Sequence, residues 1–189
     1  MNFCLWITGL PGSGKTTIAR ETEELLSREG VSTVVLAMDE LRKFLTPEPK
    51  YTEEEREIVY RALVLMAQFL VEYGRKSIII DATGNRRHFR DLARERIQEF
   101  AEVYVKCAIE VCKARERSRG NPLVEKNMYE KAQKGKLKGD LPGVTAPYEE
   151  PANPEIEVAS DALTPIEAAH EIMSYVRSRW LDQQNSADR

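Results

Sequence analysis

Short apolar runs alternate along the chain with longer segments in which apolar residues recur at helical spacing. The short runs predict buried strands, and the longer segments predict amphipathic helices. An alternation of strands and helices is typical of a parallel sheet that helices cover on both faces. We therefore expect an α/β protein with three layers around a five-stranded parallel sheet. The expected strands are Phe3–Thr8, Ser32–Ala37, Ser77–Asp81, Glu102–Ala108 and Glu155–Ala159.

Capping signals mark the starts of two expected helices. The stretch Thr52–Glu55 has the form of a capping box, and Thr164–Glu167 combines a capping box with proline at the first helical position. A glycine- and proline-rich stretch over about residues 118–151 is typical of a mobile lid rather than of another layer. We expect a single domain over residues 1–182 and a frayed tail over residues 183–189. The expected helices are Thr16–Glu29, Thr52–Gly74, His88–Phe100, Glu110–Arg117, Glu125–Lys134 and Thr164–Trp180.

The composition is that of a soluble globular protein. The 189 residues have a formal charge of −3 and 42% hydrophobic side chains. No apolar run approaches the roughly 20 residues of a membrane span, and the first run is too short for a secretory signal. The three cysteines, Cys4, Cys107 and Cys112, are therefore expected to be reduced thiols in the cytoplasm. The charge is uneven, because Ala82–Gly139 contains 15 Lys/Arg against 8 Asp/Glu, which indicates a local anionic ligand.

The clearest chemical signal is the run Gly9–Thr16, which matches the phosphate-loop pattern G-x-x-x-x-G-K-[ST]. Its glycines let successive backbone N–H groups turn toward an anion, and the following helix adds its positive N-terminal end. Lys15 is expected to reach the β- and γ-phosphates of ATP, and Thr16 is expected to ligate Mg²⁺. The expected ATP-binding residues of this loop are Gly9, Leu10, Pro11, Gly12, Ser13, Gly14, Lys15, Thr16 and Thr17.

Two aspartates lie where predicted strands end, at the sheet edge where ligands bind in α/β folds. The carboxylate of Asp39 can accept the proton of an acceptor hydroxyl, hold Mg²⁺, or merely cap the helix that follows. Asp81 ends the third strand, as the metal carboxylate of phosphate-loop enzymes does, or is a simple strand-end aspartate. Which of the two is the base and which binds the metal stays open. Arg42, three positions after Asp39, is expected to clamp a substrate phosphate.

Further polar residues are expected near the same site. Asn85 and Arg86, or Arg87 in its place, begin a helix beside the expected phosphate site, where they can bind the acceptor. Arg115, Arg117 and Arg119 recur at every second residue as the chain enters the lid. We expect Arg115 and Arg119 to close over ATP and to neutralise charge on the transferred phosphoryl group.

Together these residues resemble the adenylylsulfate kinase family of phosphate-loop kinases. The matching stretches are G-L-P-G-S-G-K-T-T at 9–17, D-E-L-R at 39–42, Y-T-E-E-E-R at 51–56, C-K-A-R at 112–115, M-Y-E-K-A at 128–132 and G-K-L-K-G-D-L-P-G-V at 135–144. The resemblance implies the nucleoside-phosphate kinase fold and transfer of the ATP γ-phosphate to the 3′-hydroxyl of adenosine 5′-phosphosulfate (APS). The product is PAPS, an intermediate of sulfate assimilation. The resemblance also implies a homodimer.

Some residue roles are implied only by this resemblance. It places Asp39 and Arg42 in the substrate and metal site, Arg56 in the sulfonucleotide site, and Lys138 as the substrate contact of the lid. Leu141 takes the position of an aromatic residue that stacks on the substrate adenine.

Besides Leu141 and extra lid residues around Gly120–Asn127, three features depart from the family pattern. Ala37 replaces an acidic residue, Val59 replaces an asparagine, and the run Asp81–Arg86 replaces a Ser-Pro-aromatic-Arg turn. The stretches D-x-x-R at 39–42 and D-A-T-G-N-R at 81–86 are also similar to polynucleotide 5′-hydroxyl kinases and related small-molecule kinases. A kinase of such an acceptor is the alternative, and only this alternative makes nucleic acid a partner. A GTP-dependent switch is a third hypothesis, because D-A-T-G fits D-x-x-G, but no N-K-x-D motif follows a later strand.

Overall fold

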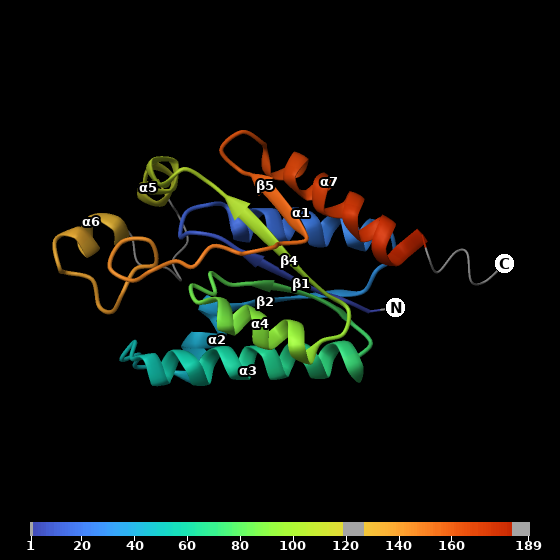
Figure 1. Ribbon diagram of the computed structural model, residues 1–189, viewed down its shortest axis with the longest axis horizontal. Helices are drawn as coiled ribbons and strands as arrows, with labels where there is room; N and C mark the ends of the chain where they lie inside the picture. Colours follow the sequence, from blue (N-terminus) through green and yellow to red (C-terminus); the bar gives the residue numbers. More distant parts are fainter. Residues whose placement is uncertain (1, 119–126, 183–189) are drawn as a thin grey trace.

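The computed structural model describes residues 2–118 and 127–182. Its strands are β1 Cys4–Thr8, β2 Thr33–Ala37, β3 Ser77–Asp81, β4 Phe100–Lys106 and β5 Ile156–Ala159. They form one sheet in the order β2-β3-β1-β4-β5, and all of the pairs are parallel (Figure 1). The expected α/β fold with a five-stranded parallel sheet is confirmed. Because β1 lies between β3 and β4, the strand order reverses at β1, and ligands bind at the carboxyl ends of strands at such a point.

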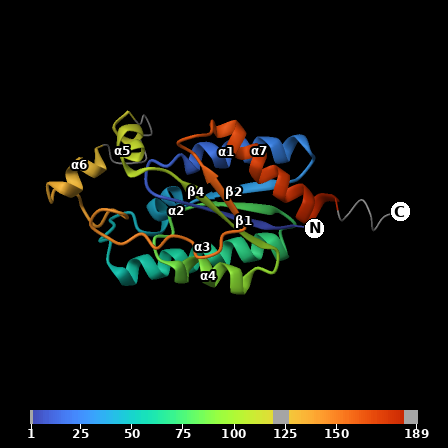
Figure 2. The same ribbon diagram turned by 45° about the horizontal axis from the view of Figure 1, so that its top comes forward.

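Helices cover both faces of the sheet. They are α1 Lys15–Arg28, α2 Met38–Leu45, α3 Glu53–Glu72, α4 Arg87–Arg96, α5 Ile109–Arg117, α6 Met128–Gln133 and α7 Pro165–Val176. Figure 2 shows α1 and α7 on one face and α3 and α4 on the other. The chain continues from α7 through a wider π-helical turn over Arg177–Leu181. None of the helices within the described residues is long and apolar enough to cross a membrane.

Each face of the sheet buries its own core, because successive side chains of a strand point to opposite faces. Leu5 and Ile7 of β1 pack in the core below α1 and α7, whereas Cys4 and Trp6 pack in the core below α3 and α4. The buried indole of Trp6 donates a hydrogen bond to the carbonyl oxygen of Ala82 at 3.0 Å. The second core therefore also holds the turn that follows β3.

The described part of the expected lid packs directly on the phosphate loop. Cys112 of α5, Tyr129 of α6 and Leu141 form a third buried cluster, against which Leu10 of the loop is packed. Figure 1 shows α5 and α6 beyond the carboxyl ends of the strands, on the side of the sheet edge where the loop lies. The segment between these two helices lies outside the described residues.

Several boundaries expected from the sequence are wrong by a few residues. Strand β4 begins and ends earlier than expected, because its Phe100 pairs with Cys4 at the start of β1. Helix α4 correspondingly ends at Arg96, and Ile97 is extended and buried in the core. These limits are set by tertiary pairing, which local periodicity does not report.

The two expected capping boxes differ. Thr164 accepts a hydrogen bond from the N–H of Glu167, whose carboxylate accepts one from the N–H of Thr164, so α7 begins with a complete box. Thr52 accepts from the N–H of Glu55 at 3.2 Å, but the Glu55 carboxylate accepts from the N–H groups of the two residues before Thr52. The second box is only half formed, because Glu55 fixes the preceding turn instead.

Candidate active site

The phosphate loop joins β1 to α1 and needs glycine where its backbone approaches other segments. Gly12 has a φ of +82°, and a Cβ at this position would lie 2.4 Å from the carbonyl oxygen of Cys112. A Cβ at Gly9 would lie 2.6 Å from the carbonyl oxygen of Val105. Gly14 has a left-handed conformation at the N-cap of α1. The N–H of Ser13 donates to the carbonyl oxygen of Leu10 at 3.0 Å and closes the turn, which curves the loop around the N-terminus of α1 as a site for an anion such as a phosphate.

The loop backbone is held by its own lysine and by the lid. Lys15 is 9% exposed, and its Nζ donates a hydrogen bond to the carbonyl oxygen of Leu10 at 2.9 Å. The hydroxyl of Tyr129 in α6 donates to the carbonyl oxygen of Pro11 at 2.7 Å. The Lys15 ammonium thus lies inside the loop, where a phosphate chain would bind.

Two cavities meet at Lys15 and Thr16. The first has a volume of about 260 Å³ and follows the loop, and the second has about 190 Å³ and opens toward α2, α3 and the turn after β3. Because both cavities share these two residues, a γ-phosphate held by the loop would border the second cavity. The predicted residues lining the first are Gly12, Gly14, Lys15, Thr16, Thr17 and Arg115. Those lining the second are Pro11, Lys15, Thr16, Asp39, Arg42, Arg56, Asp81, Asn85 and Leu141.

The strand ends bring the two aspartates to one edge of the sheet. Ala37 at the end of β2 pairs in register with Asp81 at the end of β3. Asp39 lies in the first turn of α2, and the N-cap of this helix is Ala37, which has no side-chain cap. The alternative that Asp39 merely caps the helix is therefore wrong. Asp39 and Asp81 line the second cavity together with Thr16.

Oxygen donors at this edge suit Mg²⁺. Among the described residues, no group of three His, Cys, Asp or Glu side chains is arranged to hold a metal by itself. Mg²⁺ typically keeps several waters and binds through one or two carboxylates together with substrate phosphates. The hydroxyl of Thr16 with the carboxylate of Asp39 or Asp81 fits this mode of binding.

Cationic side chains surround the acceptor side. Arg56 is 6% exposed and donates a hydrogen bond to a backbone carbonyl of the lid at 3.3 Å. Arg42 lies 3.3 Å from the carboxylate of Glu55 and 5.6 Å from the ring centre of Tyr51. Lys138 lines an adjoining cavity of about 300 Å³, which shares Arg42 and Tyr51 with the second cavity. An anionic acceptor would meet positive charge from α2, from α3 and from the lid.

Arg86 is not among the residues that line these cavities. Its guanidinium lies 3.4 Å from the carboxylate of Glu53 and 3.8 Å from that of Glu149. Two acidic side chains therefore hold the arginine that the sequence placed at the substrate.

Arg115 lines the loop cavity, but its guanidinium is hydrogen-bonded to the protein itself, to the hydroxyl of Ser160 at 3.3 Å and to two backbone carbonyls. The guanidinium donates to the carbonyl oxygen of Ser160 at 2.7 Å and to that of Ser13 at 3.4 Å. These bonds join the end of β5 to the phosphate loop. Arg117 is exposed, and Arg119 lies outside the described residues.

Comparison with known proteins decides between the kinase families that the sequence leaves open. The family model described as adenylylsulphate kinase matches residues 1–159. The chain belongs to this family. It is therefore a phosphotransferase that uses ATP and acts on a hydroxyl group. Membership in the adenylylsulfate kinase family does not favour a polynucleotide kinase or a GTP-dependent switch.

Individual relatives align with most of this chain. An adenylyl-sulfate kinase of Thermodesulfovibrio yellowstonii is 38% identical over 181 residues, which are 94% of this chain and 85% of the relative. A probable adenylyl-sulfate kinase of Archaeoglobus fulgidus is 38% identical over 161 residues, 85% of this chain and 97% of the relative. The solved APS kinase of Mycobacterium tuberculosis in complex with AMPPNP and APS superposes with a TM-score of 0.79 at 28% identity, covering 93% of this chain and 98% of its own.

Two tyrosines that line these cavities were not predicted from the sequence. Tyr51 lines both cavities on the acceptor side, and a Cβ at Gly139 of the lid would lie 2.6 Å from its side chain. An aromatic residue directly before the helix cap was the signal available for it. Tyr60 lines the second cavity, and its hydroxyl accepts a hydrogen bond from the N–H of Gly84 at 3.0 Å. Burial raises the pKa of Tyr60, so this hydroxyl stays neutral.

Proposed function

We propose that this protein transfers the γ-phosphate of ATP to the 3′-hydroxyl of adenosine 5′-phosphosulfate and so forms PAPS. The observation that carries the proposal is the junction of the two cavities at Lys15 and Thr16. One cavity has the backbone geometry of an ATP phosphate site, and the other combines a carboxylate with cationic side chains. The relatives named adenylyl-sulfate kinase support APS as the acceptor.

On the donor side, the loop N–H groups and Lys15 bind the phosphates of ATP. Thr16 and Asp81 would hold Mg²⁺, which would supply further neutralisation of the phosphate charge. Arg115 keeps the loop in position through the carbonyl oxygens of Ser13 and Ser160. Catalysis of this type depends mainly on positioning and on stabilising charge.

On the acceptor side, Asp39 orients the 3′-hydroxyl and accepts its proton. The hydroxyl oxygen attacks the γ-phosphorus in line, and a new O–P bond forms while the bond to the β–γ bridging oxygen breaks. ADP leaves with that oxygen, and Lys15 neutralises charge on the transferred group. Asp39 suits this role better than Asp81 because both line the second cavity, but only Asp39 also lines the adjoining cavity with Lys138 on the acceptor side.

The protein is proposed to bind the acceptor through the negative charges of its phosphosulfate and through its adenine ring. Arg42, Arg56 and Lys138 provide positive charge for the phosphosulfate, and Asn85 provides an amide at the same cavity. The ring of Tyr51 offers an aromatic face for the adenine. Residues 127–151 act as the described part of a lid over both substrates.

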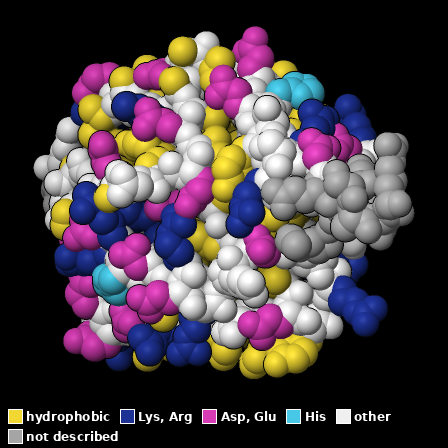
Figure 3. All heavy atoms as spheres, turned by 45° about the vertical axis from the view of Figure 1, so that its right-hand side comes forward, with side chains coloured by type: hydrophobic (Ala, Val, Ile, Leu, Met, Phe, Trp, Pro, Cys, Tyr) yellow, Lys and Arg dark blue, Asp and Glu magenta, His cyan; other side chains and the backbone are white. Residues whose placement is uncertain are grey.

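We further propose that the protein is a homodimer that associates through α3. Ile58, Leu65, Phe69 and Tyr73 are exposed and lie at helical spacing, and Tyr73 is 76% exposed. In Figure 3, a small group of hydrophobic side chains lies among charged ones at the lower edge of the molecule, where α3 lies in Figure 1. The stripe is about 22 Å long at a rise of about 1.5 Å per residue. One such stripe can pair with its own copy about a two-fold axis.

Light scattering after size-exclusion chromatography tests the dimer. The wild-type protein is expected at twice the monomer mass, and Phe69→Glu is expected at the monomer mass. A wild-type monomer at micromolar concentration would contradict the proposal.

A panel of acceptors tests the proposed reaction. ADP release with ATP·Mg²⁺ is measured for APS, for adenosine 5′-monophosphate, which lacks the sulfate, and for an oligonucleotide with a 5′-hydroxyl. The expected result is the highest kcat/KM for APS and negligible turnover of the oligonucleotide. Preferred turnover of the oligonucleotide would overturn the proposal.

The three cysteines are free thiols, which supports the cytoplasm as the place of this reaction.

A further inference from the structure

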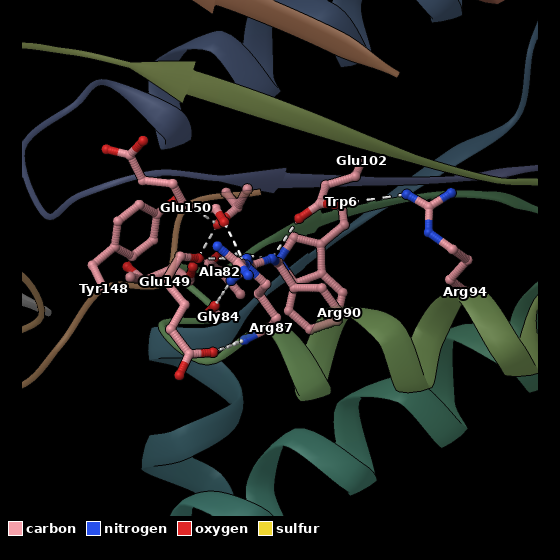
Figure 4. A network of polar contacts seen from close by, with 12 residues as sticks. Trp6, Ala82, Gly84, Arg87, Arg90, Arg94, Glu102, Tyr148, Glu149 and Glu150 are labelled. Carbon is pink, nitrogen blue, oxygen red and sulfur yellow. Dashed lines mark hydrogen bonds and ion pairs between the residues drawn. The ribbon is translucent and has the colours of Figure 1, made fainter. Parts of the chain in front are cut away.

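A buried arginine of α4 lies where three segments of the chain meet. Arg90 is 1% exposed, and its Nε donates a hydrogen bond to the carboxylate of Glu102 in β4. Its Nη1 donates to the carbonyl oxygen of Gly84, and its Nη2 donates to the carbonyl oxygen of Glu149 at 2.6 Å. Figure 4 shows the guanidinium between these partners. One side chain thus bonds to β4, to the turn after β3 and to the chain that returns from the lid.

The last two of these segments also bond to each other. We call residues 82–85 the acceptor turn and residues 147–150 the return arm. The amide of Asn85 donates a hydrogen bond to the carbonyl oxygen of Pro147 at 3.2 Å, and the N–H of Glu149 donates to the carbonyl oxygen of Asn85 at 2.8 Å. Arg90 adds a charged donor to each side of this pair, and charge-assisted hydrogen bonds are stronger than neutral ones.

The return arm is fixed to the end of β1 as well. Thr8 donates its hydroxyl hydrogen to the carbonyl oxygen of Thr83 at 2.6 Å, so the hydroxyl of Tyr148 is the donor to Thr8 at 3.0 Å. Burial raises the pKa of Tyr148 to about 12, which keeps this donor protonated. The acceptor turn is thereby held by β1, by α4 and by the return arm at once.

The acceptor turn and the segment before the return arm both contribute to the acceptor cavity. Thr83 and Asn85 line it from the turn, directly after Asp81, and Leu141 and Pro142 line it from the lid. Arg90 does not line the cavity, so it can act on a substrate only through the segments that it holds. A buried ion pair adds little stability compared with apolar residues of similar volume, so geometric order is the better account of its presence.

We propose that Arg90 is a positioning residue, which holds the acceptor turn and the return arm in register and thereby sets how well the acceptor is used. This inference rests on the proposed function for the identity of the acceptor. It predicts that Arg90 affects the kinetic constants of the acceptor and leaves those of ATP unchanged, because its partners lie outside the phosphate loop.

A double variant separates positioning from stability. Arg90→Met together with Glu102→Met removes both charges and keeps the buried volume. The expected result is a kcat/KM for APS lowered about 10- to 100-fold, with an unchanged KM for ATP and a Tm close to that of the wild type. Arg90→Lys keeps a cationic donor and is expected to recover part of the loss, and it remains informative if the double variant does not fold.

Arg94→Met is the matched control. Arg94 lies on the same helix and pairs with the same Glu102 carboxylate at 3.6 Å and with Glu155. Within the described part of the chain it makes no hydrogen bond or ion pair to the acceptor turn or to the return arm. Its kinetic constants for ATP and APS are expected to match the wild type. A wild-type kcat/KM for APS in the double variant would overturn the proposal. Equal losses of kcat/KM for ATP and for APS that accompany a lower Tm would also overturn it.

Hydrogen exchange at the Glu149 amide tests the same proposal without any acceptor. The amide is expected to exchange faster in the Arg90→Met, Glu102→Met protein than in the wild type and in Arg94→Met. Equal exchange in the three proteins overturns the positioning role. If the wild-type protein does not phosphorylate APS, the proposed function fails by itself, and the exchange measurement still decides the role of Arg90.

Discussion

Alanine at Gly12 is expected to weaken ATP binding strongly, whereas alanine at Gly30 is expected to leave it intact. Both glycines have positive φ, +82° and +75°, so alanine is strained by about 1–2 kcal/mol at either position. At Gly30 a Cβ would meet no atom within 4 Å, so backbone strain is the whole destabilisation. At Gly12 the Cβ would lie 2.4 Å from the carbonyl oxygen of Cys112, so the loop and α5 must separate by about 1 Å to reach ordinary contact.

A shift of about 1 Å in the groups that position a substrate lowers its productive use about 100-fold, which corresponds to a free energy of about 3 kcal/mol. Gly12→Ala is therefore expected to weaken ATP binding at least about 100-fold. Gly30→Ala is expected to lower Tm by about 2–8 °C with unchanged ATP affinity, because 1 kcal/mol shifts Tm by about 2–4 °C in a chain of this length. Titration with a fluorescent ATP analogue and thermal unfolding measure both effects. Wild-type ATP affinity in Gly12→Ala would refute the close approach of the loop to α5.

Three further predictions concern catalysis, the donor site and pH. Asp39→Asn is expected to lower kcat about 10²- to 10⁴-fold with unchanged ATP affinity, and a near-normal kcat would move the role of the base to Asp81. Arg115→Met is expected to raise the KM for ATP about tenfold and leave that for APS unchanged, and steady-state kinetics that show equal changes would contradict it. Burial on its own raises the pKa of Glu155, but hydrogen bonds from Arg94 and from a β4 N–H group lower it below its ordinary value. The stability from this carboxylate is present above its unfolded pKa and is lost as the pH falls through the lowered folded pKa. Glu155→Gln is therefore expected to be less stable than the wild type at neutral pH, with a difference in unfolding free energy that disappears in acid, as the pH falls through the lowered folded pKa. A difference independent of pH would contradict this.

The parts of the site that local sequence defines were predictable. The phosphate loop is one contiguous run, and Asp39 and Asp81 follow or end strands whose carboxyl ends meet at one sheet edge. A parallel α/β arrangement converts these local signals into neighbouring side chains. Prediction of the strand pattern and of the motif therefore sufficed to place the loop and the two aspartates around adjoining cavities.

Partners that are remote in sequence explain what could not be predicted. Arg115 is bonded to the carbonyl oxygen of Ser160, 45 residues later, and Arg86 is paired with Glu53 and Glu149. A charged residue near a motif gives no information on which distant carbonyl or carboxylate competes with the substrate for it. The same holds for β4, whose start is set by pairing with β1 and not by its own periodicity.

Transfer of labelled phosphate from γ-labelled ATP·Mg²⁺ to APS is the most direct test of the central claim. The reaction products are separated and compared with those of Lys15→Ala, which lacks the ammonium inside the phosphate loop. We predict that the wild-type protein places the label on the 3′-oxygen of APS, as PAPS, at a rate far above that of the variant. Intact ATP binding without labelled PAPS would contradict the assignment of the acceptor.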